Sequence, residues 1–205
     1  MTEGPALEPV VLAGRYVVLE PLEARHSSEL LAPANEEELW RHMGMKAHTA
    51  EGLAAWIDLR LQDGRTGNCL PFLIRDARTR AAIGSTSLFD YARPHRRIEI
   101  GHTWVGKSHR GTRANPEAKI LLLGHAFERL GLVRVQLKTD PLNVRSRKAI
   151  AKIGGKEEGI LRNYTTYKDG TVHDRVFFSI LDREWPDVKR RLHVLIEKTP
   201  EAGRA

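Results

Sequence analysis

The residues best placed to do chemistry lie in one loop, Gly106 to Asn115, which carries four basic side chains. A strand-like run ends just before the loop, and a helical pattern begins just after it. The first backbone N–H groups of a helix lack partners within the helix, and its dipole adds partial positive charge at that end. The loop therefore predicts an anion site, although a plain connection with solvated charges gives the same pattern. The basic residues are Lys107, His109, Arg110 and Arg113.

The helix after this loop has the features of a well-defined start. Asn115 is a favoured N-cap residue, Pro116 suits the first helical position, and Glu117 complements the helix dipole. Apolar residues then recur with helical spacing as far as Leu130, and Gly131 is placed to end the helix. A strand, a basic loop and a capped helix are thus predicted in succession.

The rest of the chain supplies the elements around this unit. Residues 132–139 alternate apolar and polar, which is typical of a strand with one buried face, and a short helix follows over 143–153. Asp169-Gly170 predicts a hairpin turn. The order indicates one α/β or α+β domain around a mixed sheet. The other predicted strands are 15–22, 70–74, 81–89, 97–105, 160–167 and 171–181, and the other helices are 26–31, 36–43, a segment capped by Thr49, 116–130 and 184–198.

Composition narrows the class of protein. The 205 residues suit one domain, and their net charge of +7 favours polyanionic partners, such as a phosphorylated cofactor or RNA, without choosing between them. Cys69 is the only cysteine, so an internal disulfide is excluded and the residue is expected in the core. No apolar run reaches the ~20 residues of a membrane span and no signal pattern opens the chain, so we expect a cytoplasmic protein without membrane contact. The usual metal and hydrolase motifs are missing, and no metal is expected.

One long run resembles a known family. The sequence RGTRANPEAKILLLGHAFERLGLVRVQLKTDPLNVRSRKAIAKIGG is similar to the cofactor-binding core of the GNAT superfamily of N-acetyltransferases. It most resembles the Rim-type branch, which acetylates the amino termini of ribosomal proteins. IEIGHTW before it, and EEGILRNY and DGTVHDRVFFSI after it, extend the resemblance over residues 15–182. The resemblance implies an enzyme that moves an acetyl group from acetyl-coenzyme A (acetyl-CoA) to an amine.

The resemblance also implies the fold. It predicts a GNAT-like single domain with a mixed, mostly antiparallel sheet of about six to seven strands flanked by helices. In this family the fourth strand splays from the fifth, and the pantetheine arm of the cofactor lies in the gap. Residues 97–105 match the fourth strand and 132–139 the fifth. We divide the chain into an N-terminal tail at 1–13, the acetyltransferase domain at 14–183, and a C-terminal helix and tail at 184–205.

Cofactor-binding residues follow from the same resemblance. The loop over 109–115 is expected to hold the pyrophosphate, and the fourth-strand N–H near Val105 to bind the thioester carbonyl oxygen. Asn143 is expected to contact the pantetheine arm, although an ordinary N-cap explains it equally well. Where the family has small residues, this loop has Arg113 and Asn115, and the Arg113 side chain is expected to bind phosphate instead. The full set is Trp104, Val105, His109, Arg110, Gly111, Thr112, Arg113, Ala114, Asn115, Asn143, Ser146 and Arg147.

The resemblance points to Ser146 as the acid that protonates the leaving thiolate. Many family members use a tyrosine on the helix after the fifth strand, and that position is Ile150 here. The ribosomal-protein branch has a serine one turn earlier, which Ser146 matches. Serine in a first helical turn also has an ordinary structural explanation.

The base has more than one candidate. Glu99 on the fourth strand is the first, and a structural ion pair with Arg96 or Arg97 is its alternative. His102 on the same strand is a weaker candidate, and His173, beside an aspartate, is interpreted as structural. An α-amine has a pKa of ~8, so a modest base suffices for a protein N-terminus.

The sequence leaves the acceptor open. A protein N-terminal α-amine is the first hypothesis, with association with the ribosome as a corollary. A small amine, such as an antibiotic, a polyamine or an amino acid, is the second. A non-catalytic module that binds coenzyme A or RNA is the third. Both a monomer and a homodimer are compatible with the sequence.

Overall fold

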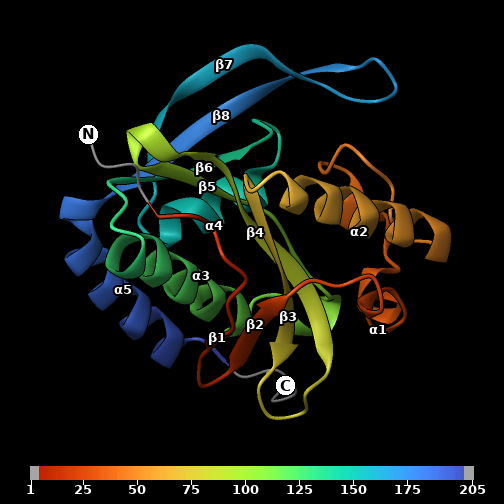
Figure 1. Ribbon diagram of the computed structural model, residues 1–205, viewed down its shortest axis with the longest axis horizontal. Helices are drawn as coiled ribbons and strands as arrows, with labels where there is room; N and C mark the ends of the chain where they lie inside the picture. The colour runs from red at the N-terminus through yellow and green to blue at the C-terminus, as the bar shows by residue number, and fades with distance from the viewer. Residues whose placement is uncertain (1–4, 201–205) are drawn as a thin grey trace.

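The computed structural model describes residues 5–200 and shows one continuous sheet with helices on both faces (Figure 1). The strands are β1 (Leu12–Ala13), β2 (Val17–Pro21), β3 (Cys69–Asp76), β4 (Ala82–Ala92), β5 (Arg97–Val105), β6 (Arg134–Thr139), β7 (Lys156–Thr166) and β8 (Val172–Leu181). Their order in the sheet is β1-β2-β3-β4-β5-β6-β8-β7, and only β5 and β6 are parallel. The predicted mixed, mostly antiparallel sheet is confirmed. It has eight strands rather than six to seven, because β1, within the segment predicted as a tail, pairs with β2.

In the part of the chain that the structure describes, five α-helices cover the sheet. They are α1 (His26–Ala34), α2 (Ala50–Arg65), α3 (Ala114–Gly124), α4 (Val144–Lys152) and α5 (Trp185–Lys198). Buried side chains of α3, α4 and α5 pack in one core on one face of the sheet, and those of α1 and α2 pack in a second core on the other. None of these helices combines the length and apolar character needed to cross a membrane. Residues 1–4 of the predicted tail and residues 201–205 at the other end lie outside the described residues.

The second core is built on three tryptophans. Trp40, Trp56 and Trp104 are buried, with ring centroids 5.3 to 6.0 Å apart in tilted or edge-to-face contacts. Such contacts add to the free energy of burying the rings. Because Trp104 points into this core from β5, its side chain faces away from α3. Cys69 is buried as expected, and burial raises the pKa of its thiol to about 11.

Two predicted helix caps have different outcomes. Thr49 caps α2 as predicted, because its side-chain oxygen accepts a hydrogen bond from the Gly52 N–H at 3.1 Å. The predicted cap at Asn115 is wrong, because α3 already begins at Ala114. The Thr112 hydroxyl accepts the Ala114 N–H at 3.3 Å and so serves the helix start earlier in the chain.

Glu117 does more than complement the helix dipole. Its buried carboxylate accepts the backbone N–H groups of Arg15, Tyr16 and Val17 at 2.6 to 2.9 Å. A buried carboxylate needs such donors to offset the loss of water. Glu117 thereby fixes the start of β2 on the first turn of α3, beside the basic loop.

Lys119 is a buried amine in α3 that the sequence pattern did not single out. It is only 5% exposed, and its Nζ donates to Thr103 Oγ1 at 2.7 Å. No ion pair joins it to a carboxylate within residues 5–200. Burial lowers its pKa to about 7.

Replacing this amine, as in Lys119→Met, is expected to remove part of the pH dependence of stability. The pKa of Lys119 is about 7 in the folded protein against an ordinary 10.5, so between these values the unfolded chain holds a proton that the folded protein lacks. The free energy of unfolding of the wild type should therefore rise with pH relative to the variant, by up to about 1.4 kcal/mol per pH unit. Urea unfolding of both proteins at about pH 7 and about pH 9 measures this difference. An equal difference at both pH values would contradict it.

Candidate active site

Strands β5 and β6 form a fork. They pair in parallel at one end of β6 and separate beyond Glu99 and Gln136, while β5 stays paired with β4 and β6 with β8. The facing edges of the two strands therefore have no neighbouring strand in the open half. The predicted splay of the two strands is confirmed. The paired positions are Arg97 with Arg134, Ile98 with Val135 and Glu99 with Gln136.

Strand β5 carries a bulge where it enters the open half of the fork. Ser87 pairs with Gly101 and Ser85 with Trp104, so β5 has one residue more than β4 over this stretch. His102 lies in the bulge with a φ of +50°, which is uncommon outside glycine. A bulge changes the direction of the side chains that follow it and is frequent beside active sites.

Glu99 lies at the apex of the fork and is 1% exposed. Its Oε2 accepts hydrogen bonds from Gln136 Nε2 at 2.9 Å and from Lys138 Nζ at 2.8 Å. Burial raises the pKa of Glu99 above its ordinary value, although the Lys138 charge acts in the opposite direction. Glu99 is thus a carboxylate whose affinity for a proton is increased.

One oxygen of Glu99 remains available. Oε1 accepts no hydrogen bond from any residue within 5–200. Gly101 lies beside it, and a Cβ there would be 3.5 Å from Oε1 and 2.6 Å from the ring of Phe89. Glycine at position 101 lets the Phe89 ring pack closely against β5, because a Cβ there would collide with the ring.

The ion-pair partners predicted for Glu99 in the structural alternative are wrong, although Glu99 does form an ion pair, with Lys138. Arg97 Nη1 pairs with Asp90 Oδ2 at 3.3 Å, and Arg96 Nη1 reaches the Gly131 carbonyl. Neither arginine contacts Glu99, because Glu99 faces the side of the sheet that carries Lys138.

His102 is a poor candidate for the base. Its ring stacks on Phe89 with centroids 4.2 Å apart, and its Nε2 contacts Arg60 Nη1. Burial, reinforced by the charges of Arg60 and Lys138, lowers the pKa of His102 to about 3. Because so weak a base takes up few protons at neutral pH, the geometry favours Glu99 over His102.

Helix α4 begins at the other side of the fork. Asn143 is its N-cap as predicted, since Asn143 Oδ1 accepts the Ser146 N–H at 3.0 Å. Ser146 is half-buried in the first turn, and its hydroxyl forms no hydrogen bond with any residue that the structure describes. Ile150 is buried in the core and supplies no hydroxyl of its own. Arg147 is held by Glu157, at 3.0 Å between Nη2 and Oε2.

The β7–β8 hairpin is bonded to the segment that follows β6 and to the segment between α1 and α2. Asp140, just before α4, has its Oδ2 3.3 Å from His173 Nδ1 and 3.4 Å from Arg175 Nη1. Arg175 donates to the Tyr167 hydroxyl at 2.6 Å, which in turn donates to the carbonyl of His42 between α1 and α2. His173 therefore lies within hydrogen-bonding distance of Asp140, as its structural interpretation requires.

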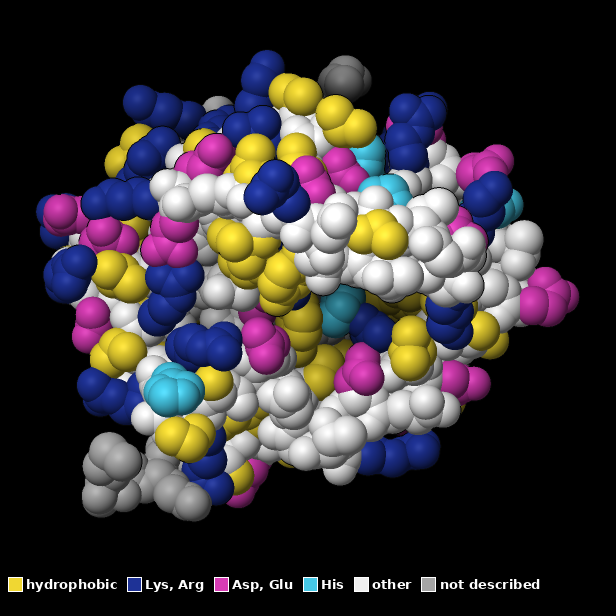
Figure 2. Space-filling view, turned by 90° about the horizontal axis from the view of Figure 1, so that it is seen from above, with side chains coloured by type: hydrophobic (Ala, Val, Ile, Leu, Met, Phe, Trp, Pro, Cys, Tyr) yellow, Lys and Arg dark blue, Asp and Glu magenta, His cyan; other side chains and the backbone are white. Residues whose placement is uncertain are grey.

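The hairpin therefore crosses the molecule beside the fork. In Figure 1 it runs along the top of the sheet toward α2. Figure 2 shows the face seen from above, with a hollow near its centre where hydrophobic, basic and histidine side chains meet. Such a concave, mixed surface is typical of a ligand-binding region.

In the basic loop, side chains mainly hold the backbone in place. Arg110 pairs with Glu36 at 2.6 Å and donates to the Val105 carbonyl at 3.2 Å. Arg113 donates to the Thr199 carbonyl at 2.6 Å and to the Tyr16 hydroxyl at 2.7 Å. The same guanidinium group was predicted to bind phosphate, and such a contact would compete with its hydrogen bonds to Thr199 and Tyr16.

The backbone of the loop keeps anion-binding capacity. Gly111 has a φ of +74°, and a Cβ there would meet no atom within 4 Å. The N–H groups of Gly111 and Thr112 donate to no residue within 5–200. Free N–H groups before a helix N-terminus suit a phosphate.

Acetyl-CoA fits this arrangement. The open strand edges of the fork offer backbone groups to the amide-containing pantetheine arm, and the Asn143 Nδ2 donates no hydrogen bond to the described residues. The residues that would hold the cofactor are the 109–115 loop, the end of β5 at Trp104-Val105, and Asn143 with Ser146. Within residues 5–200, no group of three His, Cys, Asp or Glu side chains is arranged for a metal ion.

Sequence reasoning missed three partners in the site. Gln136 and Lys138 hold Glu99, and Asp140 holds the hairpin. The alternation of residues 132–139 placed Gln136 and Lys138 on one face of the strand. This shared face was the only indication in the sequence that the two side chains act together. Nothing in the sequence linked that face to Glu99, because the pairing of β5 with β6 joins residues 37 positions apart.

Comparison with known proteins is consistent with this geometry. The model of the acetyltransferase (GNAT) domain matches residues 17–156. The "Putative ribosomal N-acetyltransferase YdaF" of Bacillus subtilis is 31% identical over 84% of this chain and 93% of its own. A GCN5-related N-acetyltransferase from Brucella melitensis is 29% identical, with a TM-score of 0.87 over 96% of this chain and 89% of that one. Mycobacterium smegmatis RimJ in complex with CoA-disulfide is 26% identical, with a TM-score of 0.72 over 94% and 95% of the two chains. The chain belongs to the GNAT family of acetyltransferases.

Proposed function

We propose that the protein transfers the acetyl group of acetyl-CoA to the α-amine of a protein N-terminus. The observation that carries the proposal is the fork between β5 and β6, with Glu99 at its apex and the first turn of α4 at its other side. Acetyl-CoA supplies the acetyl group as a thioester: the amine nitrogen bonds to the carbonyl carbon, the C–S bond breaks, and the thiol leaves.

Glu99 is the proposed base. Its Oε2 is held by Gln136 and Lys138, while its Oε1 accepts no hydrogen bond from the described residues and is the atom proposed to take the proton. A carboxylate with a raised pKa is better suited to accept a proton from an ammonium group than an ordinary one. An α-amine with a pKa of ~8 is already partly neutral at pH 7, so the demand on this base is modest.

Ser146 is the proposed acid, and the N–H near Val105 is the proposed donor to the carbonyl oxygen. Two observations support Ser146. Its half-buried hydroxyl forms no hydrogen bond with any described residue, and it lies in the first turn of α4. The partial positive charge at that end of the helix favours the developing thiolate. Val105 lies in the open half of β5, where that strand pairs with β4 but not with β6.

Two considerations support a protein acceptor. The names of the relatives refer to ribosomal N-acetylation and to RimJ. The hairpin, tied to Asp140 and His42, adds a long wall beside the fork against which an extended chain can lie. A small amine as acceptor is a distinct outcome of the test below.

The test is a panel of acceptors incubated with isotopically labelled acetyl-CoA and read by mass spectrometry. We expect acetylation of peptide α-amines and little of lysine side chains, because a lysine with a pKa of ~10.4 is about 10²-fold less neutral than an α-amine at the same pH. The matched control is the same peptide with a blocked α-amine and a free lysine. Turnover of small amines alone, or of the blocked peptide at an equal rate, would overturn the protein N-terminus as acceptor.

A further inference from the structure

Lys119 is a buried lysine that the proposed mechanism does not use. It is 5% exposed, and within residues 5–200 its Nζ has one hydrogen-bond partner, the hydroxyl of Thr103 at 2.7 Å. Burying an amine without a carboxylate costs stability, because water no longer solvates it. An apolar side chain would fill the same place without that cost. The amine of Lys119 therefore needs an explanation other than packing.

Thr103 lies in the bulge of β5 and joins Lys119 to the neighbouring strand. Its Oγ1 is 2.7 Å from the Thr86 hydroxyl of β4 and 3.3 Å from the Gly101 carbonyl oxygen. Thr86 is completely buried and lies where the pairing of β4 with β5 is interrupted. The side chains of Lys119, Thr103 and Thr86 thus form a hydrogen-bonded chain from α3 across the bulge to β4.

The bulge changes the face of the sheet to which the following side chains point. Ile100 packs in the core beside α3. In an unbroken strand, residues 103 and 105 would then face the opposite side of the sheet. In the structure, Thr103 bonds to α3, and Val105 packs in the same core as Ile100. The bond between Lys119 and Thr103 is therefore available only when β5 is bulged.

The direction of the backbone N–H groups changes in the same way. The Gly106 N–H donates to the carbonyl of Ile83 in β4 at 2.8 Å. Successive N–H groups of a strand point to opposite edges, so the Val105 N–H points away from β4, toward the open edge of the fork. Without the extra residue of the bulge, this N–H would point to β4 instead. The bulge makes available the donor that is proposed for the carbonyl oxygen.

We propose that Lys119 is a positioning residue, which holds the bulge of β5 through Thr103 and so directs the Val105 N–H into the fork. This inference rests on the proposed function, because Val105 has its role only in acetyl transfer. The amine donates to Thr103 Oγ1, so the Thr103 proton is left for Thr86 or the Gly101 carbonyl. Hydrogen bonds joined in this way strengthen one another in a buried place.

The experiment compares Lys119→Met and Thr103→Val with the wild type. Each variant removes one partner of the bond and keeps a side chain of similar size. We expect kcat to fall by about tenfold in each, the factor for the loss of one buried hydrogen bond that only the active form of β5 makes. The melting temperature of Lys119→Met at pH 7 should not fall, because the change removes a buried amine that has no carboxylate partner.

Amide hydrogen exchange of the protein without cofactor gives a readout that is independent of activity. The Val105 N–H faces the open fork in the wild type and should exchange quickly. In Lys119→Met and in Thr103→Val it should turn toward β4 and exchange more slowly. A merely structural role of Lys119 predicts the opposite, because a destabilised protein exchanges its amides faster.

A double variant tests whether Lys119 acts through Thr103. Lys119→Met/Thr103→Val should be no worse in kcat than either single variant, since both changes remove the same bond. Thr103→Ser keeps the hydroxyl and should keep kcat.

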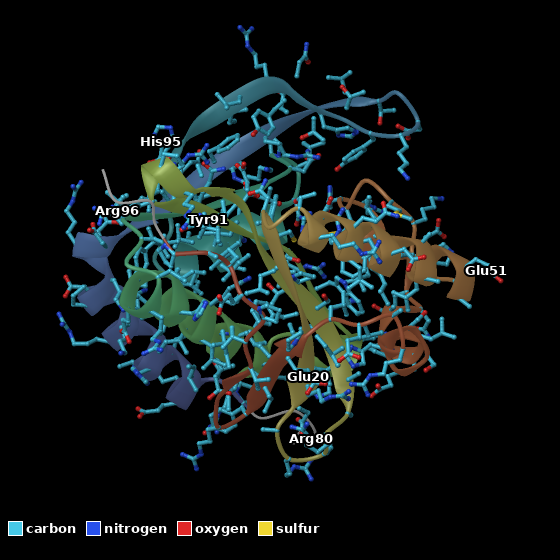
Figure 3. All side chains as sticks on the ribbon, viewed as in Figure 1. Glu20, Glu51, Arg80, Tyr91, His95 and Arg96 are labelled. Carbon is cyan, nitrogen blue, oxygen red and sulfur yellow. The ribbon has the colours of Figure 1, made fainter. Side chains whose placement is uncertain are left out.

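Two control variants remove a cation elsewhere. Lys152→Met is the matched change at an exposed lysine in the last turn of α4. Arg96→Met changes an exposed arginine just before β5, at the edge of the molecule in Figure 3. Both controls should keep kcat and the exchange rate of the Val105 amide.

The other outcomes overturn the inference in different ways. A kcat of Lys119→Met within twofold of the wild type, or losses that add in the double variant, would show that Lys119 does not act through Thr103. A lower kcat with faster exchange at Val105 and a lower melting temperature would make Lys119 structural. If the wild type acetylates no amine, the proposed function fails, and exchange at Val105 still decides whether Lys119 holds the bulge.

Discussion

Glu99→Gln is expected to lower kcat by ~10²–10⁴-fold, the usual contribution of a general base. Glutamine has the same shape but accepts no proton at neutral pH, so Oε1 loses its function while the packing at the apex of the fork is kept. Oε1 accepts no hydrogen bond from the described residues and is the atom that we propose takes the proton from the amine. Steady-state kinetics with the best peptide acceptor measure the effect, with the dissociation constant of coenzyme A expected to change little.

The pH dependence of kcat is a second test of Glu99 as the base. Burial raises the pKa of Glu99, so the base becomes protonated, and activity is lost, as pH falls through a value above the ordinary carboxyl range. Glu99→Gln should remove that acidic limb. Lys138→Met should move the limb to higher pH. The Lys138 charge opposes the effect of burial on the pKa of Glu99, so without that charge the pKa should rise further.

Glu158→Gln is the control for this change. It replaces another glutamate that is held in an ion pair, with Arg134, and whose pKa is lowered to about 2. The control should keep kcat and the acidic limb. A Glu99→Gln variant with kcat within twofold of the wild type would assign the base to another group.

Much of the fold could be predicted because local patterns and tertiary structure agree. The boundaries of β5 match the sequence prediction, and Thr49 and Asn143 cap their helices as expected. Helix α3 begins before the predicted position, and Thr112 rather than Asn115 supplies a side-chain acceptor there, for the Ala114 N–H. Two residues of similar capping ability stand close together there, and sequence alone does not rank them.

Strand β1, the eighth strand, could not be predicted, because contacts between residues distant in the chain hold it in place. β1 has only two residues, too few for an alternating pattern. It is held where the Glu117 carboxylate collects the N–H groups at the start of β2, about a hundred residues away in the chain. Such an anchor is invisible before the fold brings the two segments together.

Motifs in the sequence indicate candidate site residues, but they do not show the charge partners of those residues. The candidates from the sequence were the loop, Asn143, Ser146 and Glu99. It assigned the arginines of the loop to phosphate, whereas Arg110 pairs with Glu36 and Arg113 donates to main-chain carbonyls near residue 199. Basic residues in a sequence show available charge and hydrogen-bond donors, but only the structure shows which of these donors already have partners.

Ser146→Ala is expected to lower kcat and kcat/KM together by ~10²–10⁴-fold and to leave the coenzyme A dissociation constant nearly unchanged, because a hydroxyl that acts only in the transition state contributes nothing to cofactor binding. The structure sharpens this expectation. Asn143 Oδ1, not the Ser146 hydroxyl, caps α4, so the variant should lose far less than the ~1 kcal/mol of a missing cap.

Ser27→Ala is the matched control for Ser146→Ala, since Ser27 is also a half-buried serine in a first helical turn, that of α1. It should keep both stability and turnover. Measuring kcat, coenzyme A affinity and melting temperature on both variants separates the explanations. A loss of melting temperature with full turnover would make Ser146 structural. Full turnover with an unchanged melting temperature would mean that the Ser146 hydroxyl is needed neither for stability nor for catalysis. The thiolate would then take its proton from water. The hydroxyl forms no hydrogen bond with a described residue, so its removal disturbs no other group.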